Sequence, residues 1–109
     1  MSIEAVKAVK GITHAPNGEP LSRSEYFVLR ELADYINQAK QCAWPSIPTL
    51  AAGCRISDRY CRIILRSLER KGCIRSERRA DPEKPGRNLT NSYRLLVGGG
   101  ELEFPRVGN

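Results

Sequence analysis

The residues most suited to chemistry in this chain are four arginines in the run S-D-R-Y-C-R-I-I-L-R-S-L-E-R-K-G, residues 57–72. They recur every three or four residues, which is the spacing of one helix face. A guanidinium is a planar, permanently charged fork that binds phosphate oxygens or the edge of a guanine base. The opposite side of the same helix is predicted to be apolar and to face a core, through Cys61, Ile64, Leu65 and Leu68. This pattern predicts a helix that can lie on a protein core and contact a polyanion, although a solvated surface helix would look similar.

The positive charge of the chain is concentrated around this helix. The 109 residues carry a formal net charge of +6. Residues 55–94 hold twelve lysines and arginines and five acids, a net charge of +7, whereas the remainder carries −1. Ten of those twelve basic residues are arginine. One basic segment in an otherwise nearly neutral chain is typical of a surface that binds a polyanion such as nucleic acid.

Other kinds of chemistry have little support in the sequence. The four cysteines contain no C-x-x-C pair, and the single histidine, His14, lies far from them, so no zinc spacing is present. Cys54, Cys61 and Cys73 are predicted to be small buried apolar residues, with Cys42 partly exposed. Residues 98–100, three glycines, lack the flanking strand and helix of a phosphate-binding loop. We therefore expect no catalytic activity, no metal and no cofactor.

The elements that must position the arginines can be read from capping and breaking residues. Ser22 with Glu25 forms a capping-box pattern, Ser46 and Ser57 are predicted N-caps, and Gly72 is predicted to end the arginine-bearing helix. We expect helices at 2–12, 23–38, 47–52 and 58–71, strands at 73–79 and 91–97, a tight turn at 53–56 and a basic hairpin tip at 80–90. The chain then divides into an N-terminal helix and loop at 1–21, one domain at 22–97 and a flexible tail or linker at 98–109.

The order of helix, short helix, tight turn, helix and basic hairpin is that of a helix-turn-helix followed by a wing. In the runs C-A-W-P-S-I-P-T-L-A-A, S-D-R-Y-C-R-I-I-L-R-S-L-E-R-K-G-C-I and G-R-N-L-T-N-S-Y-R-L the chain resembles the winged helix-turn-helix family. The resemblance is to the subgroup of phage and plasmid replication proteins and regulators, and covers about residues 22–97. It implies a mainly α fold with a small β-hairpin (α+β), a three-helix core plus a two-stranded wing, and double-stranded DNA as the ligand.

Three positions depart from the family pattern. The family often has glycine in the turn where Arg55 stands, so Gly53 could take a left-handed conformation in a shifted turn instead. The family also often has threonine and arginine at the positions of Tyr60 and Ile63. Because of these departures, the base contacts typical of the family cannot be transferred directly to this chain.

Three groups of residues are predicted to contact DNA. The start of the recognition helix lies nearest the base edges in the major groove, and its candidate residues are Ser57, Arg59, Tyr60, Arg62, Ile63 and Arg66. Ile63 could contact a thymine methyl or could pack on the preceding helix or on Tyr60. The candidate phosphate contacts at the short helix and the turn are Ser46, Thr49 and Arg55, where Ser46 can both cap and bind. The candidate wing contacts, to the backbone or an adjacent minor groove, are Arg78, Arg79, Lys84 and Arg87.

The predicted function is sequence-specific binding of double-stranded DNA. The resemblance favours the origin-binding domain of a phage or plasmid replication initiator over a small transcriptional regulator, because the G-G-G-E-L-E-F-P run at 98–105 looks like a linker. A winged-helix module that binds an acidic protein is the alternative of a different class. Expected partners are DNA and a replication or transcription protein at the tail. The apolar face of Ile3, Val6 and Val9 could form a homodimer or fold onto its own domain. Because no run of about 18 apolar residues and no signal-peptide stretch is present, a cytoplasmic location without membrane contact is expected.

Overall fold

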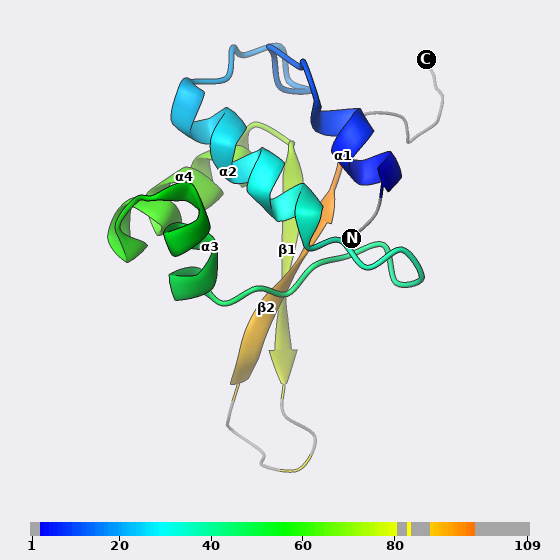
Figure 1. Cartoon of the computed structure of the whole chain (residues 1–109), viewed down its shortest axis with the longest axis vertical. Coiled ribbons are helices and arrows are strands. Elements are labelled where there is room, and N and C mark those ends of the chain that lie inside the picture. Colours follow the sequence, from blue (N-terminus) through cyan, green and yellow to red (C-terminus); the bar gives the residue numbers. More distant parts are fainter. Residues whose placement is uncertain (1–2, 81–82, 84–87, 98–109) are drawn as a thin grey trace.

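The computed structural model describes residues 3–80, 83 and 88–97, with the side chains of 79, 80 and 88–90 left out (Figure 1). Its elements in chain order are α1 (Ile3–Val9), α2 (Arg23–Asp34), α3 (Ile47–Cys54), α4 (Asp58–Arg70), β1 (Ile74–Ala80) and β2 (Asn88–Leu95). In Figure 1 the helices gather at one end and the two strands project away from them. The prediction of a mainly helical α+β chain with one hairpin is confirmed at this level, and the arrangement is compatible with a small winged-helix-like domain.

Serine side chains begin the three central helices. The Ser22 Oγ accepts a hydrogen bond from the Glu25 backbone N–H at 3.1 Å, while the Ser22 N–H donates to Glu25 Oε1 at 2.8 Å. Ser46 and Ser57 each accept from the backbone N–H three residues later, at 3.2 and 3.1 Å. Because each hydroxyl satisfies an N–H that the first helical turn leaves unpaired, these caps determine where α2, α3 and α4 start. All three predicted caps are confirmed.

The core lies among the helices and the base of the hairpin. The predicted core-facing residues of α4, among them Leu65 and Leu68, are all buried, and they pack with Leu29 of α2 and Leu50 of α3. Val9 of α1 has no exposed surface and belongs to the same core, whereas the first residue of α1 is mostly exposed. At least part of the apolar face of α1 is therefore used within its own chain.

A buried ion pair fastens the end of α4 to the start of α2. Glu25 Oε1 accepts hydrogen bonds from Lys71 Nζ and the Ser22 N–H, both at 2.8 Å, and Glu25 Oε2 accepts one from Ser67 Oγ. Lys71 Nζ also donates to the Pro20 carbonyl at 2.9 Å. Burial raises the pKa of Glu25, but the hydrogen bonds from Lys71, Ser67 and Ser22 and the positive charge of Lys71 lower that pKa further, to about 2. Glu25 therefore stays ionised, which helps to orient α4.

The hairpin is held to the helices by a third segment of chain. β1 and β2 are antiparallel, with Ser76 opposite Tyr93 and a register shift between Glu77 and Arg79. Ala43, just before α3, exchanges two backbone hydrogen bonds with Tyr93, at 2.9 and 2.7 Å. The 42–44 stretch, which lies outside the helices and strands predicted from the sequence, thus lies beside β2.

Five predicted boundaries were wrong by two residues or more. Helix α1 ends at Val9 rather than 12, and strand β2 ends at Leu95 rather than 97. Helix α2 ends at Asp34 rather than 38, because the chain turns back and the Asn37 N–H donates to the Cys42 carbonyl at 2.8 Å. Helix α3 continues to Cys54 rather than ending at 52. Strand β2 begins at Asn88 rather than 91, because it already pairs there with Ala80 of β1. Most of the expected hairpin tip and the expected tail at 98–109 lie outside the described residues. Within the described ranges, none of the helices has the length and apolar character required to cross a bilayer.

Candidate nucleic-acid interface

Three arginines on the outer face of α4 form the centre of the candidate interface. Arg59, Arg62 and Arg66 are exposed, and none of them has an ion-pair or hydrogen-bond partner among the residues that the structure describes. Arg70 on the same helix differs, because its Nη1 lies 3.2 Å from Glu19 Oε2. The acids of the described part thus neutralise the end of the arginine series but not its first three members, which remain able to bind phosphate or base edges.

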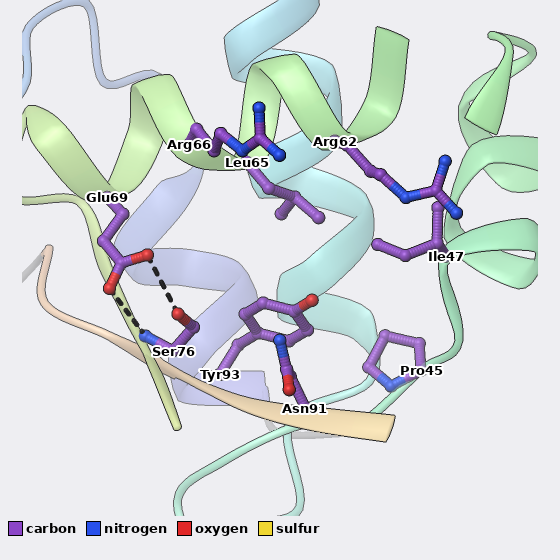
Figure 2. A pocket seen from close by; sticks show the side chains of 9 residues that line it. All are labelled: Pro45, Ile47, Arg62, Leu65, Arg66, Glu69, Ser76, Asn91 and Tyr93. Carbon is purple, nitrogen blue, oxygen red and sulfur yellow. Dashed lines mark hydrogen bonds between the residues drawn. The ribbon is translucent and has the colours of Figure 1, made fainter. Parts of the chain in front are cut away.

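An open groove of about 440 Å³ runs between α4 and the hairpin (Figure 2). Its lining residues come from α4, from both strands and from the segment that leads into α3: Pro45, Ile47, Arg62, Leu65, Arg66, Glu69, Ser76, Asn91 and Tyr93. Figure 2 shows Arg62 and Arg66 extending from α4, with Asn91 and Tyr93 of β2 on the other side. The groove therefore combines an apolar floor with cationic and amide groups at its rim.

Glu69, the acidic residue that lines this groove, is hydrogen-bonded to β1. Glu69 Oε1 accepts a hydrogen bond from Ser76 Oγ at 2.9 Å, and its Oε2 accepts one from the Ser76 N–H at 3.4 Å (Figure 2). These bonds hold β1 against α4. They also direct the carboxylate toward the hairpin.

The other residues of α4 that were predicted to contact DNA are Ser57, Tyr60 and Ile63, and they lie at different places around the helix. The Tyr60 hydroxyl hydrogen-bonds to Ser24 Oγ of α2 at 3.2 Å, so this side chain leans toward the start of α2. Ile63 is 48% exposed on the surface, as a contact to a thymine methyl requires. Ser57 caps the helix and is exposed at its start. The structure therefore keeps Tyr60 and Arg62 on separate flanks of α4.

The start of α3 and the turn after it hold the three predicted phosphate contacts. Ser46 Oγ donates to Thr49 Oγ1 at 2.8 Å, in addition to its capping bond, and Thr49 is exposed. Arg55 is exposed and adopts φ 60° and ψ 44°, a left-handed conformation that ends α3. Gly53 lies within the helix, so the expectation that it takes over the left-handed position was wrong. The residue in the left-handed conformation is Arg55 instead, so a cationic side chain stands at this turn.

The predicted wing contacts are described only in part. Arg78 is exposed on β1, beside the register shift of the hairpin. Arg79 lies in β1, and its side chain is outside the described part. Lys84 and Arg87 lie outside the described residues.

Sequence reasoning missed the hairpin wall of the groove. Ser76 and Tyr93 face each other across the strands, and Asn91 is two residues from Tyr93 on the same strand face. Burial raises the pKa of Tyr93, while a hydrogen bond from the Asn91 side chain lowers it less. Alternation of side chains along N-S-Y-R-L would have placed residues 91, 93 and 95 on one face, but the sequence could not show that α4 lies opposite them.

The cysteines belong to the packing rather than to the interface. Cys61 and Cys73 are buried, and Cys54 and Cys42 are partly buried. Burial raises the pKa of Cys54 and of Cys73 to about 11, so both remain thiols near neutral pH. Within the described ranges, no three His, Cys, Asp or Glu side chains come together in a way that could hold a metal ion.

No protein-family model, curated protein or solved structure matches the chain. The function is therefore inferred from the residues and their geometry.

Proposed function

We propose that the chain binds double-stranded DNA in a sequence-specific manner, with α4 as the recognition helix. The observation that carries this proposal is the exposure of Arg59, Arg62 and Arg66 without acidic partners in the described part, on the side of α4 opposite its buried residues. An α-helix fits the major groove of B-DNA, where arginine can bind guanine O6 and N7 together. A module that binds an acidic protein would use the same arginines, and weak affinity for DNA would distinguish it.

The neighbouring elements would position α4 by binding the DNA backbone. Thr49 at the start of α3 and Arg55 after it are exposed, and a helix N-terminus favours a phosphate. The groove beside α4 would admit the sugar–phosphate strand, with Arg62 and Arg66 on one wall and Asn91 on the other. Phosphate contacts fix register, so these residues would set which bases Arg59 meets.

For the biological role, we propose the origin-binding domain of a phage or plasmid replication initiator. This rests on the resemblance of the helix-turn-helix and hairpin segments to that subgroup. A small transcriptional regulator is the alternative, and both would act in the cytoplasm of a bacterium. The proposed partners beyond DNA are a second copy of the chain and a replication or transcription protein.

The test is selection of bound sequences from a random duplex pool, followed by titration of variants. Arg59→Ala should weaken binding to the selected site by about 1–3 kcal/mol and relax preference at one base pair, whereas Arg62→Ala should weaken binding to all duplexes alike through the loss of a phosphate contact. Arg70→Ala removes the same charge from the Glu19 pair and serves as the matched control. If no consensus emerged and both variants bound like the parent chain, recognition through α4 would be wrong.

The two roles can then be separated by where the consensus occurs in the genome that encodes the chain. Repeated copies within a replication origin support the initiator. A site overlapping a promoter supports the regulator.

A further inference from the structure

The hairpin has a second face, directed away from the groove, that the proposed function does not use. Side chains alternate across a sheet, so the neighbours of Ser76 and Tyr93 point to the opposite side. We name this surface the outer sheet face, and its described residues are Trp44, Arg75, Glu77, Ser92 and Arg94. Trp44 is 37% exposed, and the two arginine side chains are 58% and 41% exposed.

Trp44 reaches this face through the segment that lies beside β2. Ala43 is fully buried and pairs with Tyr93, so the next residue, Trp44, lies on the opposite side and beside Ser92. The Lys40 Nζ lies 5.5 Å from the centroid of the Trp44 ring. An aromatic ring and an ammonium group therefore stand at the edge of the outer sheet face.

The arginines of this face are only partly neutralised. Arg75 and Arg94 stand directly opposite each other, an arrangement of like charges that destabilises a strand pair. They share one carboxylate, because Glu77 lies 3.7 Å from Arg75 Nη2 and 4.0 Å from Arg94 Nε. Arg94 Nε is buried and has no hydrogen-bond acceptor among the described residues. With Lys40, the face holds three cations against one carboxylate.

We propose that the outer sheet face binds single-stranded DNA, with one base stacked on Trp44 and phosphates at Lys40, Arg75 and Arg94. An indole ring binds a base through its flat face, which a duplex hides within the stack and an unpaired strand exposes. The cations supply the electrostatic attraction to the backbone. An acidic peptide would meet the charges but would offer no planar base to the ring. The outer sheet face is separate from α4, so this proposal can be tested independently of duplex recognition.

Trp44 is the only tryptophan of the chain, so its fluorescence reports this site directly. Oligothymidylate of about 15 nucleotides should quench the fluorescence in a saturable manner. The logarithm of the affinity should fall with the logarithm of salt concentration by about 0.7 per neutralised phosphate.

Substitutions test where on the protein the single strand binds. The affinity of each variant is measured from the fluorescence anisotropy of a dye-labelled oligothymidylate. Trp44→Ala and the pair Arg75→Ala with Arg94→Ala should each weaken binding about tenfold or more, while Trp44→Phe retains a stacking ring and loses less. Arg70→Ala removes one positive charge outside this face and should have little effect. Duplex affinity should be unchanged in Trp44→Ala. Circular dichroism verifies folding, and if Trp44→Ala does not fold, Arg75→Ala and Trp44→Phe decide the question.

Three results would overturn the proposal. One is the absence of quenching by the oligonucleotide. Another is loss of single-strand binding in Arg59→Ala and Arg62→Ala without loss in the variants of the outer sheet face, which would place the strand on α4. The third is equal quenching by polyglutamate, which would show a site for acidic chains in general.

Discussion

At the scale of single residues, the partner of a charged group decides what that group can do. Arg66 and Arg70 are four residues apart on one helix, yet Arg70 is paired with Glu19 and Arg66 has no acidic partner in the described part of the chain. Glu19 is 51 positions from Arg70 in the sequence. No local pattern could assign that pair. The ion pair with Glu19 therefore distinguishes Arg70 from the three earlier arginines of α4.

The ionised Glu25 predicts a specific dependence of stability on pH. Its pKa is about 2 in the folded chain against an ordinary 4.5, so its contribution to folding is complete above about pH 5 and is lost as the pH falls toward 2. The full effect is on the order of 3 kcal/mol, of which about 2 kcal/mol should be gone by pH 3. Urea denaturation at a series of pH values measures this loss in the free energy of unfolding.

A matched pair of variants isolates the contribution of Glu25. Glu25→Gln leaves the Lys71 ammonium buried without its counter-charge and should destabilise the chain by about 3–5 kcal/mol near neutral pH. The difference between the parent chain and this variant should shrink as the pH falls from 5 to 3. Glu19→Gln breaks the exposed pair with Arg70 and should cost no more than about 1 kcal/mol. Equal pH profiles for the parent chain and Glu25→Gln would contradict the role of this carboxylate.

At the scale of elements, the start of α4 depends on a strained turn as well as on a cap. Ser57 caps the helix, and Arg55, two residues earlier, has the left-handed φ of 60°. A non-glycine residue loses about 1–2 kcal/mol in that conformation. Glycine would adopt this conformation at lower cost in free energy. A phosphate contact at this position, however, requires a cationic side chain such as that of Arg55.

Arg55→Gly should therefore separate stability from binding. The free energy of unfolding should rise by up to about 1 kcal/mol, because glycine adopts this conformation without strain but loses more chain entropy on folding. Affinity for duplex DNA should fall, because one phosphate contact is lost. Thermal denaturation and DNA titration of the same preparation measure both quantities. A less stable variant would contradict the strain at Arg55, and a variant that binds DNA as well as the parent chain would refute its phosphate role.

At the scale of the whole molecule, the arrangement of charge is the main argument for a polyanionic ligand. The net charge of +6 comes from one segment, residues 55–94, and this segment contains both α4 and the hairpin. The groove brings the two together, because Glu69 of α4 holds Ser76 of β1 and Ala43 holds Tyr93 of β2. Arg62 and Arg66 of α4 therefore face the hairpin within one surface, whereas Arg75 and Arg94 belong to the outer sheet face.

This surface predicts how duplex affinity responds to salt. The logarithm of the affinity should fall linearly with the logarithm of salt concentration, by about 0.9 for each phosphate neutralised. Replacing both Arg62 and Arg66 by alanine should reduce that slope by about 1.8 if each binds one phosphate. Titrations at several salt concentrations on the selected duplex and on an unrelated one give the slopes. An unchanged slope with weaker binding would mean that the two side chains contact bases instead.

The sequence by itself determined the local features of this protein. The serine caps, the helical spacing of α4 and the glycine after it follow from short-range hydrogen bonding and periodicity, so they could be read without a structure. Tertiary structure alone decided the rest. The end of α2, the strand-like stretch at Ala43, the pairing of Arg70 and the groove wall at Tyr93 all depend on contacts between distant segments. Which distant segments come into contact depends on how the whole chain buries its apolar side chains and pairs its backbone groups. A local sequence pattern does not specify the distant partner of a given residue.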